Sequence, residues 1–355
     1  MTVDISRLEQ LTGQFAVDFG AALHAATVVL GDRLGLYRAL AEHGPIDGAG
    51  LAAATGCDPR LVEEWCRAQY VSGYCCADPE AGTYWLDPEQ ATLLASPDDP
   101  ACLVGAMTIA AALWKDEEEV GRRFRSGTGF AWHEHHPDLF DGTERLFRPG
   151  YAANLVSGWI PALDGVDARL ADGADVADVG CGHGASTILL AQAYPRSTVI
   201  GYDYHEASIA QARKRAAEAG LADRVRFEVA GAADLPPAPG GEGYGLVCVF
   251  DALHDMGDPA GAARHVRGRL APDGTWMIVE PMAGESLAEN VNPVGRIFYS
   301  ASPFICTPAA LAQGGPALGN QVPEATWREL LAEAGFSRFR RATETPFNRV
   351  FEARP

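Results

Sequence analysis

The sequence predicts an α/β protein in which a mainly helical region precedes a doubly wound, mostly parallel sheet. From Ala174 onward, runs typical of strands alternate with runs typical of helices. This alternation indicates a parallel sheet with helices on both faces. The first 96 residues instead show apolar residues at helical spacing, two short helices and one hairpin.

Length and charge limit the organisation and the partners of the chain. Its 355 residues fit two domains, since domains usually hold about 100–200 residues. The formal net charge of −19 disfavours nucleic acid and anionic membranes. We therefore expect a small-molecule partner and a second copy of the chain.

The sequence indicates a cytoplasmic protein. We find no uncharged apolar run of about 18 residues, so no transmembrane helix is expected. The N-terminal residues lack the basic and apolar regions of a signal peptide. Eight cysteines are scattered or, at Cys75 and Cys76, adjacent, which fits neither a zinc motif nor a disulfide framework. We expect buried thiols and no metal.

The N-terminal region has the pattern of a winged helix. Apolar residues from Leu8 to Leu23 recur at helical spacing, and two short helices follow, joined by a turn at 55–58. A hairpin with its turn at 78–82 comes next. Residues 1–96 carry a net charge of −8, whereas DNA-binding modules are usually basic.

The second half predicts a sheet that ends in an antiparallel hairpin. Residues 282–322 show little pattern, and we expect them to cover the site, because so long a stretch inside a domain is usually functional or disordered. The expected strands are 175–180, 197–203, 224–231, 245–251, 275–281, 336–342 and 348–354.

A glycine loop follows the first of these strands. Gly180, Gly182 and Gly184 let the backbone turn tightly and approach a ligand, and Asp203 ends the next strand. A carboxylate there can accept hydrogen bonds from both hydroxyls of a ribose, so the pair predicts a nucleoside site. The loop also fits a nicotinamide dinucleotide fold. The missing second βαβ half and the final hairpin argue against that fold.

These residues, with 250–255, Glu280 and the turn at 334–336, resemble the class I S-adenosylmethionine-dependent methyltransferases. Within that family the chain is similar to small-molecule O-methyltransferases with an N-terminal winged-helix dimerisation domain. The resemblance implies a Rossmann-like seven-stranded sheet, S-adenosyl-L-methionine as cofactor, a homodimer and a role in secondary metabolism. We expect a dimerisation domain at 1–96, a helical linker and substrate-pocket segment at 97–170, and the methyltransferase domain at 171–355.

The resemblance also assigns the cofactor residues. The glycines would line the methionine part, Asp203 the ribose, Ala232 and Ala233 the adenine, and Asp251 the amino end. Gly231 stands where the family often has an acid that holds the adenine amino group. The expected cofactor-binding residues are Asp178, Gly180, Gly182, Gly184, Asp203, Tyr204, Ala232, Ala233, Asp251 and Tyr151.

His254 is the candidate general base. It follows the fourth strand, at the carboxyl edge where open α/β sheets bind ligands. A neutral imidazole there could take a proton from a hydroxyl, with Glu280 orienting the ring. A structural histidine is the alternative. The second acid that is usual in the family is replaced by Gln321.

A histidine-rich loop supplies candidates for the substrate pocket. Three histidines in one short loop rarely enclose one ion, so we expect a substrate-pocket role rather than a metal site, with a solvated loop as the alternative. The adjacent His254 and Asp255 also resemble iron-dependent C-methyltransferases of 2-oxo acids, but no later histidine completes such a site. The expected pocket residues are Trp132, His133, His135, His136, Asn154, Phe298 and Tyr299.

The sequence therefore predicts O-methylation of a small organic molecule. Two alternatives stay open. One is a C- or N-methyltransferase of a natural-product intermediate, possibly metal-assisted. The other is a winged-helix transcriptional regulator with a methyltransferase-like sensor domain.

Overall fold

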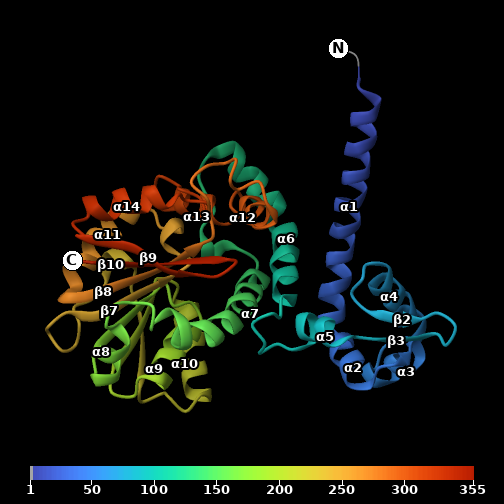
Figure 1. Cartoon of the computed structure of the whole chain (residues 1–355), viewed down its shortest axis with the longest axis horizontal. Coiled ribbons are helices and arrows are strands. Elements are labelled where there is room, and N and C mark those ends of the chain that lie inside the picture. The colour runs from blue at the N-terminus through green and yellow to red at the C-terminus, as the bar shows by residue number, and fades with distance from the viewer. Residues whose placement is uncertain (1–2) are drawn as a thin grey trace. The chain divides into compact units, whose positions relative to one another are not determined.

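The computed structural model describes residues 3–355. The chain divides into two compact units, coloured along the chain in Figure 1. The first unit holds the residues up to 115 together with 136–150, and the second holds 116–135 and 151–355. Helices α6 (Val104–Ser126) and α7 (Pro137–Asn154) each contribute to both units.

The first unit confirms the predicted helices and hairpin. Asp47 and Asp58 cap its two short helices, each by accepting hydrogen bonds from backbone N–H groups of the first turn. The hairpin and one further strand form a small antiparallel sheet in the order β1-β3-β2. The elements are α1 (Ile5–Arg33), α2 (Leu36–His43), β1 (Ile46–Asp47), α3 (Gly48–Thr55), α4 (Pro59–Val71), β2 (Cys76–Asp78), β3 (Thr83–Trp85) and α5 (Pro88–Ala95).

Helix α1 leaves most of its apolar residues exposed. Phe15 is 70% exposed and Leu23 is 60% exposed, whereas Val28 and Val29 near its end are buried. By length and composition alone, α1 is long and apolar enough to cross a membrane. Asp18 interrupts the helix, so the sequence still contains no uncharged apolar run of about 18 residues, and one such helix is weak evidence of a membrane segment. An exposed apolar face of this size needs a covering partner.

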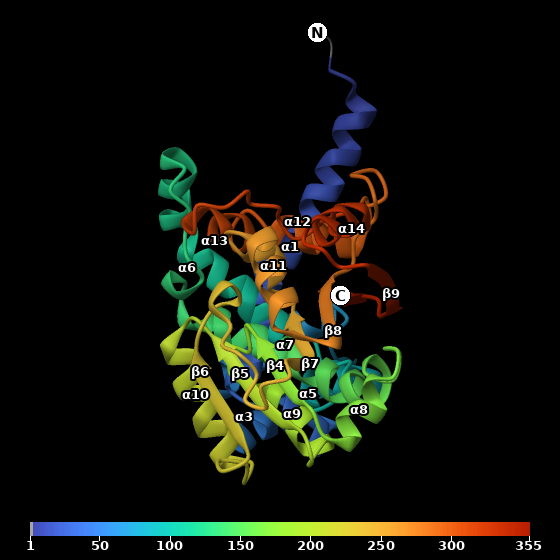
Figure 2. The same ribbon diagram turned by 90° about the vertical axis from the view of Figure 1, so that its left-hand side faces the viewer.

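The second unit contains the predicted seven-stranded sheet. Its strand order is β6-β5-β4-β7-β8-β10-β9, parallel from β6 to β8 and antiparallel at β10 and β9. Figure 2 shows β6, β5, β4 and β7 side by side. The strands are β4 (Asp175–Val179), β5 (Thr198–Asp203), β6 (Val225–Val229), β7 (Tyr244–Phe250), β8 (Leu270–Pro281), β9 (Arg338–Glu344) and β10 (Asn348–Arg354).

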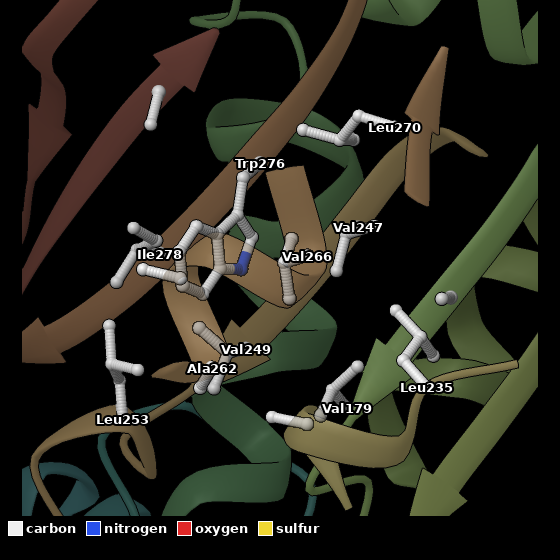
Figure 3. Packing of buried hydrophobic residues seen from close by; sticks show 14 of the residues in the cluster. Val179, Leu235, Val247, Val249, Leu253, Ala262, Val266, Leu270, Trp276 and Ile278 are labelled. Carbon is white, nitrogen blue, oxygen red and sulfur yellow. The ribbon is translucent and has the colours of Figure 1, made fainter. Parts of the chain in front are cut away.

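Two apolar cores cover the two faces of this sheet. Successive side chains of a strand point to opposite faces, so Val176 of β4 joins one core and Ala177 the other. Helices α11 (Pro259–Arg269) and α14 (Glu324–Glu333) pack on the core that contains Trp276. Figure 3 shows Val266 of α11 beside Trp276. Helices α8 (Val166–Asp172), α9 (Ala185–Ala193) and α10 (Glu206–Glu218) pack on the other. The fold is doubly wound, as predicted.

The segment 282–322 is more regular than its sequence suggested. It contains α12 (Pro293–Ala301) and α13 (Cys306–Ala312). Both helices are short, and prolines lie within or beside them, which hides helical periodicity. Asn292 caps α12 by accepting from the N–H of Gly295.

Helix α13 also anchors the loop 127–135. The N–H of Phe130 donates to the carbonyl of Pro308 at 2.9 Å. Gly129 has a φ of +73°, and a Cβ there would lie 2.6 Å from the same carbonyl oxygen. The loop therefore approaches α13 too closely for any other residue.

Asp178 ties β4 to α9 inside the second unit. Its Oδ2 accepts hydrogen bonds of 2.6 Å from the hydroxyls of Ser186 and Thr187. Its Oδ1 is buried and has no hydrogen-bond partner within residues 3–355. Burial raises the pKa of Asp178 to about 6, against the lowering effect of the two hydroxyls.

We predict that Gly129→Ala destabilises the protein by about 1–3 kcal/mol more than Gly127→Ala. Gly127 has a similar φ of +71° but open space at its Cβ position, so it controls for the cost of the backbone conformation. Urea unfolding of both variants measures the difference. Equal losses of stability would show that the loop does not pack on α13 as described.

We predict that Asp178→Asn stabilises the protein increasingly as pH rises. The folded-state pKa of about 6 lies above the ordinary 3.8, so the folded state holds this proton more tightly than the unfolded state does. The contribution of Asp178 to wild-type stability should therefore fall as pH rises through that range. The variant's advantage in free energy of unfolding should grow by up to about 3 kcal/mol between pH 4 and 8. An advantage independent of pH would contradict the raised pKa.

Candidate functional site

The glycine loop and Asp203 meet at the carboxyl edge of the sheet. Gly180, Gly182 and Gly184 all have positive φ, from +53° to +82°, which only glycine adopts readily. The Asp203 carboxylate accepts from the N–H of Gly182 at 2.9 Å and from the N–H of His205 at 2.8 Å. Burial raises the pKa of Asp203 while these N–H groups lower it. The carboxylate is thus fixed beside the loop with acceptor capacity left over.

A second buried carboxylate, Asp251, follows β7. Its Oδ1 accepts from the side-chain amide of Asn348 at 2.8 Å, and its Oδ2 accepts from the Tyr151 hydroxyl at 3.5 Å. Burial and the nearby Glu280 raise the pKa of Asp251 to about 8. Such a carboxylate gains from a cationic partner. Asn348, which holds it, carried no signal in the sequence.

The remaining cofactor candidates flank this edge. Ala232 and Ala233 belong to the short turn η3 (Ala232–Asp234), which follows β6. Tyr204 follows Asp203 and lies edge-on to His133, with ring centroids 6.2 Å apart. Asp178 lies in β4, directly before the loop, and its hydrogen bonds with two hydroxyls indicate a structural role.

His254 lies between two carboxylates. It belongs to the turn η4 (Leu253–Asp255), and its Nδ1 is 2.7 Å from Glu280 Oε2. Its Nε2 is 3.1 Å from Asp255 Oδ1. Burial alone would lower the pKa of His254, but Asp255 and Glu280 outweigh it and raise the pKa well above 6.5. The structure therefore joins the two predicted catalytic residues directly.

Cys306, the first residue of α13, completes this cluster. Donor atoms of His254, Asp255 and Cys306 all lie within 4.8 Å of one another. In the part of the chain that is described, this is the one group of such side chains that could hold a metal ion. Sequence reasoning missed Cys306 because it lies in the segment without pattern and is far along the chain from His254.

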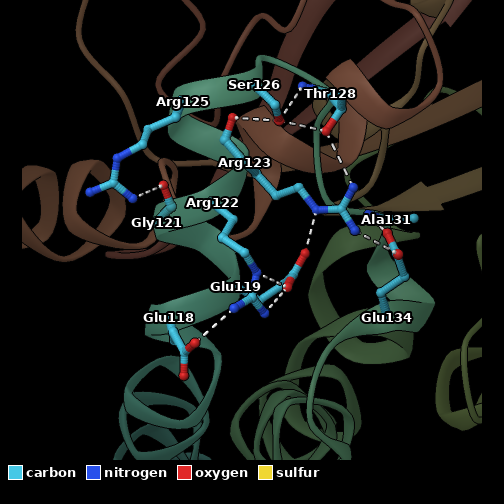
Figure 4. Close-up of polar contacts among 10 residues, drawn as sticks. All are labelled: Glu118, Glu119, Gly121, Arg122, Arg123, Arg125, Ser126, Thr128, Ala131 and Glu134. Carbon is cyan, nitrogen blue, oxygen red and sulfur yellow. Dashed lines mark hydrogen bonds and ion pairs between the residues drawn. The ribbon is translucent and has the colours of Figure 1, made fainter.

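The histidine-rich loop is fixed by charged side chains of its own. Arg123 in α6 pairs with Glu119 at 2.7 Å and with Glu134 at 3.2 Å, and donates to the Thr128 hydroxyl (Figure 4). Glu134 also accepts from the N–H of Ala131 at 2.7 Å. The loop is therefore held at both of its ends.

His135 in this loop forms a second histidine–carboxylate pair. Its Nδ1 is 2.8 Å from Asp116 Oδ2, and its side chain is fully buried against Phe130, with ring centroids 4.3 Å apart. Burial lowers the pKa of His135 in spite of Asp116. The Asp255 carboxylate acts on the same pKa, so the two histidines share one electrostatic neighbourhood.

The other pocket candidates are spread more widely. Trp132 and His133 lie in the turn η1 (Trp132–Glu134), whereas His136 belongs to the first unit. Phe298 and Tyr299 lie on α12, where Tyr299 is 40% exposed. Asn154 ends α7. Their role in a substrate pocket stays a prediction.

Gln321 stands where the resemblance implied a second acid. Its Nε2 donates to the carbonyl of Met282 at 3.0 Å, and its side chain is nearly buried. A neutral amide cannot stabilise an imidazolium as a carboxylate does. Glu280 and Asp255 therefore supply the negative charge around His254.

Comparison with known proteins supports this reading of the fold. Residues 170–332 match a family model described as "Methyltransferase domain", and residues 21–96 match the "Rv2258c-like winged HTH domain". Trans-aconitate 2-methyltransferase from Delftia acidovorans is 37% identical over 112 residues, which are 32% of this chain and 40% of the relative. The 27-O-demethylrifamycin SV methyltransferase from Amycolatopsis mediterranei is 31% identical over 171 residues, 46% of this chain and 57% of the relative.

The chain thus spans about half the length of these curated relatives. Solved structures show the same fold over the whole chain. Human N-acetylserotonin methyltransferase in complex with SAM has a TM-score of 0.69 at 16% identity, covering 100% of this chain and 99% of that structure. The chain therefore joins a winged-helix domain to a methyltransferase domain, and the predicted resemblance to class I S-adenosylmethionine-dependent methyltransferases with an N-terminal winged-helix domain is confirmed.

Proposed function

We propose that the protein transfers a methyl group from S-adenosylmethionine to a hydroxyl of a small organic molecule in secondary metabolism. The His254–Glu280 contact of 2.7 Å carries this proposal. A hydroxyl must lose its proton as the new bond forms, and a histidine oriented by a carboxylate is suited to take it. Names of relatives, such as 27-O-demethylrifamycin SV methyltransferase, support a small acceptor.

In this proposal the cofactor lies along the carboxyl edge of the sheet. Asp203 accepts from the ribose hydroxyls, and the glycine loop contacts the methionine part. Asp251 faces the amino group, whose positive charge suits a buried carboxylate with a raised pKa. Tyr151, held by Asp251, packs over the methionine end. Asp178, Tyr204, Ala232 and Ala233 complete the site.

The protein's part in the chemistry is positioning and proton removal. S-adenosylmethionine supplies an activated methyl group, and the acceptor attacks it in line. Glu280 holds Nδ1 of His254, which leaves Nε2 as the atom that receives the proton. Asp255 contacts Nε2 in the structure, so the acceptor must take the place of Asp255 there.

We predict that two substitutions separate cofactor binding from chemistry. His254→Ala should cut turnover by about 10²-fold or more and leave cofactor affinity nearly unchanged. Asp203→Ala should weaken cofactor binding by about 1 kcal/mol or more, because a charged hydrogen-bond acceptor is lost. Calorimetry with S-adenosylmethionine and mass spectrometry of a panel of phenols, carboxylic acids and amines measure both effects.

Three results would contradict the proposal. Methylation only of nitrogen or carbon acceptors would show that no hydroxyl is the target. Full turnover by His254→Ala would remove the general base. A joint loss of turnover and cofactor affinity in that variant would make His254 structural.

We also propose that the protein is a cytoplasmic homodimer formed through α1. The first unit, with the proposed dimerisation domain at 1–96 and part of the proposed pocket segment at 97–170, leaves Phe15, Phe19 and Leu23 between 56% and 70% exposed. A second copy of the same helix offers a matching apolar surface, as closed symmetric dimers do. The methyltransferase domain at 171–355 completes the proposed division.

We predict a dimer for the wild type and a monomer for Phe15→Asp, because a buried unpaired charge is costly at an interface. Val71→Asp is the matched control: Val71 is 81% exposed on another helix of the first unit and should leave the dimer intact. Light scattering measures the mass of each variant. A monomeric wild type, or binding of α1 to lipid vesicles, would refute the proposal.

A further inference from the structure

The contacts of His254 cannot all be satisfied by a neutral ring. A neutral imidazole carries one N–H, and the 2.7 Å contact gives it to Glu280. Asp255 Oδ1 lies 3.1 Å from Nε2 and has no hydrogen-bond partner among residues 3–355, so two electron-rich atoms lie close together. A positive charge between them removes this conflict. Either a second proton or a metal ion can supply that charge.

We propose that His254, Asp255 and Cys306 bind one thiophilic divalent cation of the Zn²⁺ class. The ligands would be Nε2, a carboxylate oxygen and Sγ, which already lie within 4.8 Å of one another. Ligand atoms around a tetrahedral zinc ion are roughly 3.3–3.6 Å apart, given bonds of about 2.0–2.3 Å. Small side-chain movements therefore suffice to form the site.

The surroundings of His254 are those of a metal ligand. A histidine that binds a metal through one nitrogen usually donates its other N–H to a carboxylate, as Nδ1 does to Glu280. Glu280 is fully buried, and its Oε1 has no hydrogen-bond partner among residues 3–355. Asp251 adds a second buried acid close by. Together these carboxylates favour an added cation.

The donor set selects the kind of ion. One nitrogen, one oxygen and one sulfur suit Zn²⁺, Co²⁺ or Fe²⁺, whereas Mg²⁺ and Ca²⁺ prefer oxygen alone. His254 and Cys306 are buried, and Asp255 is partly exposed, so an ion can enter from the Asp255 side. On binding, the ion replaces the thiol proton of Cys306 and any proton held between Nε2 and Asp255.

The ion would occupy the nitrogen that the general base uses. For its effect on turnover, the inference rests on the proposed function: an ion on Nε2 should slow hydroxyl methylation, and a chelator should restore it. Ion binding itself does not depend on that function. The two proposals can therefore fail separately.

Cobalt substitution tests the site directly. The full-length protein is freed of metal with a chelator and titrated with Co²⁺, which reports its ligands by absorption. We expect one equivalent to bind, with visible bands of four-coordinate Co²⁺ and a near-ultraviolet band from sulfur-to-cobalt charge transfer. Mg²⁺ should neither bind nor compete.

Variants assign the ligands. Cys306→Ser should lose the charge-transfer band, whereas Cys57→Ser, at a half-buried cysteine of the first unit, should keep it. Asp255→Asn should keep the band but bind Co²⁺ at least tenfold more weakly, and Glu280→Gln should weaken binding by about 10–100-fold. S-adenosylmethionine affinity, measured in parallel, shows that each variant is folded.

The inference is overturned if folded wild-type protein gives no cobalt bands, or if Cys306→Ser binds Co²⁺ with the wild-type spectrum. Should Cys306→Ser fail to fold, Asp255→Asn decides: unchanged Co²⁺ affinity in that variant rules out the site. Methylation that persists in metal-free protein leaves the proposed function intact in every case.

Discussion

Parallel pairing of the central strands is the constraint on which the site depends. Because β4, β5, β7 and β8 run in one direction, their carboxyl ends meet at one edge of the sheet. Asp178, Asp203, Asp251 and Glu280 all lie at or just beyond these ends. Four acids are thereby placed close together in a largely buried region. The remaining groups of the site compensate the negative charges of these four acids.

Each acid is compensated by a different partner, and the partners determine what each can do. Asp178 accepts hydrogen bonds from two hydroxyls, which gives it a structural role. Asp203 accepts hydrogen bonds from two backbone N–H groups, which fix the position of the carboxylate without neutralising its charge. Asp251 has only an amide and a distant hydroxyl, so its charge is the least compensated. Glu280 takes the imidazole of His254. The cofactor and a cation are thus expected where compensation by the chain is weakest.

The sequence predicted those parts of the site that depend on local pattern. The glycine loop, Asp203 and the pair His254–Glu280 follow strand ends that periodicity locates, and the final hairpin follows from two strand patterns with no helix between them. Cys306, Asn348 and Asp116 could not be found in this way, because each meets its partner only through tertiary packing. Periodicity also failed in 282–322, where short helices with prolines resemble loops. The exposed apolar face of α1 is a property of three-dimensional burial, which a sequence pattern cannot show.

Helix α13 connects the two histidine–carboxylate pairs of the second unit. It begins at Cys306, beside His254, and two residues later the carbonyl of Pro308 holds the loop that carries His135. Gly129 allows no space for the loop to move closer, and Arg123 restrains the loop from its other side. A shift of α13 must therefore move the sulfur of the cluster and the His135 loop together. Asp255 favours the charged form of both histidines, although at His135 its contribution is smaller than those of Asp116 and Glu134.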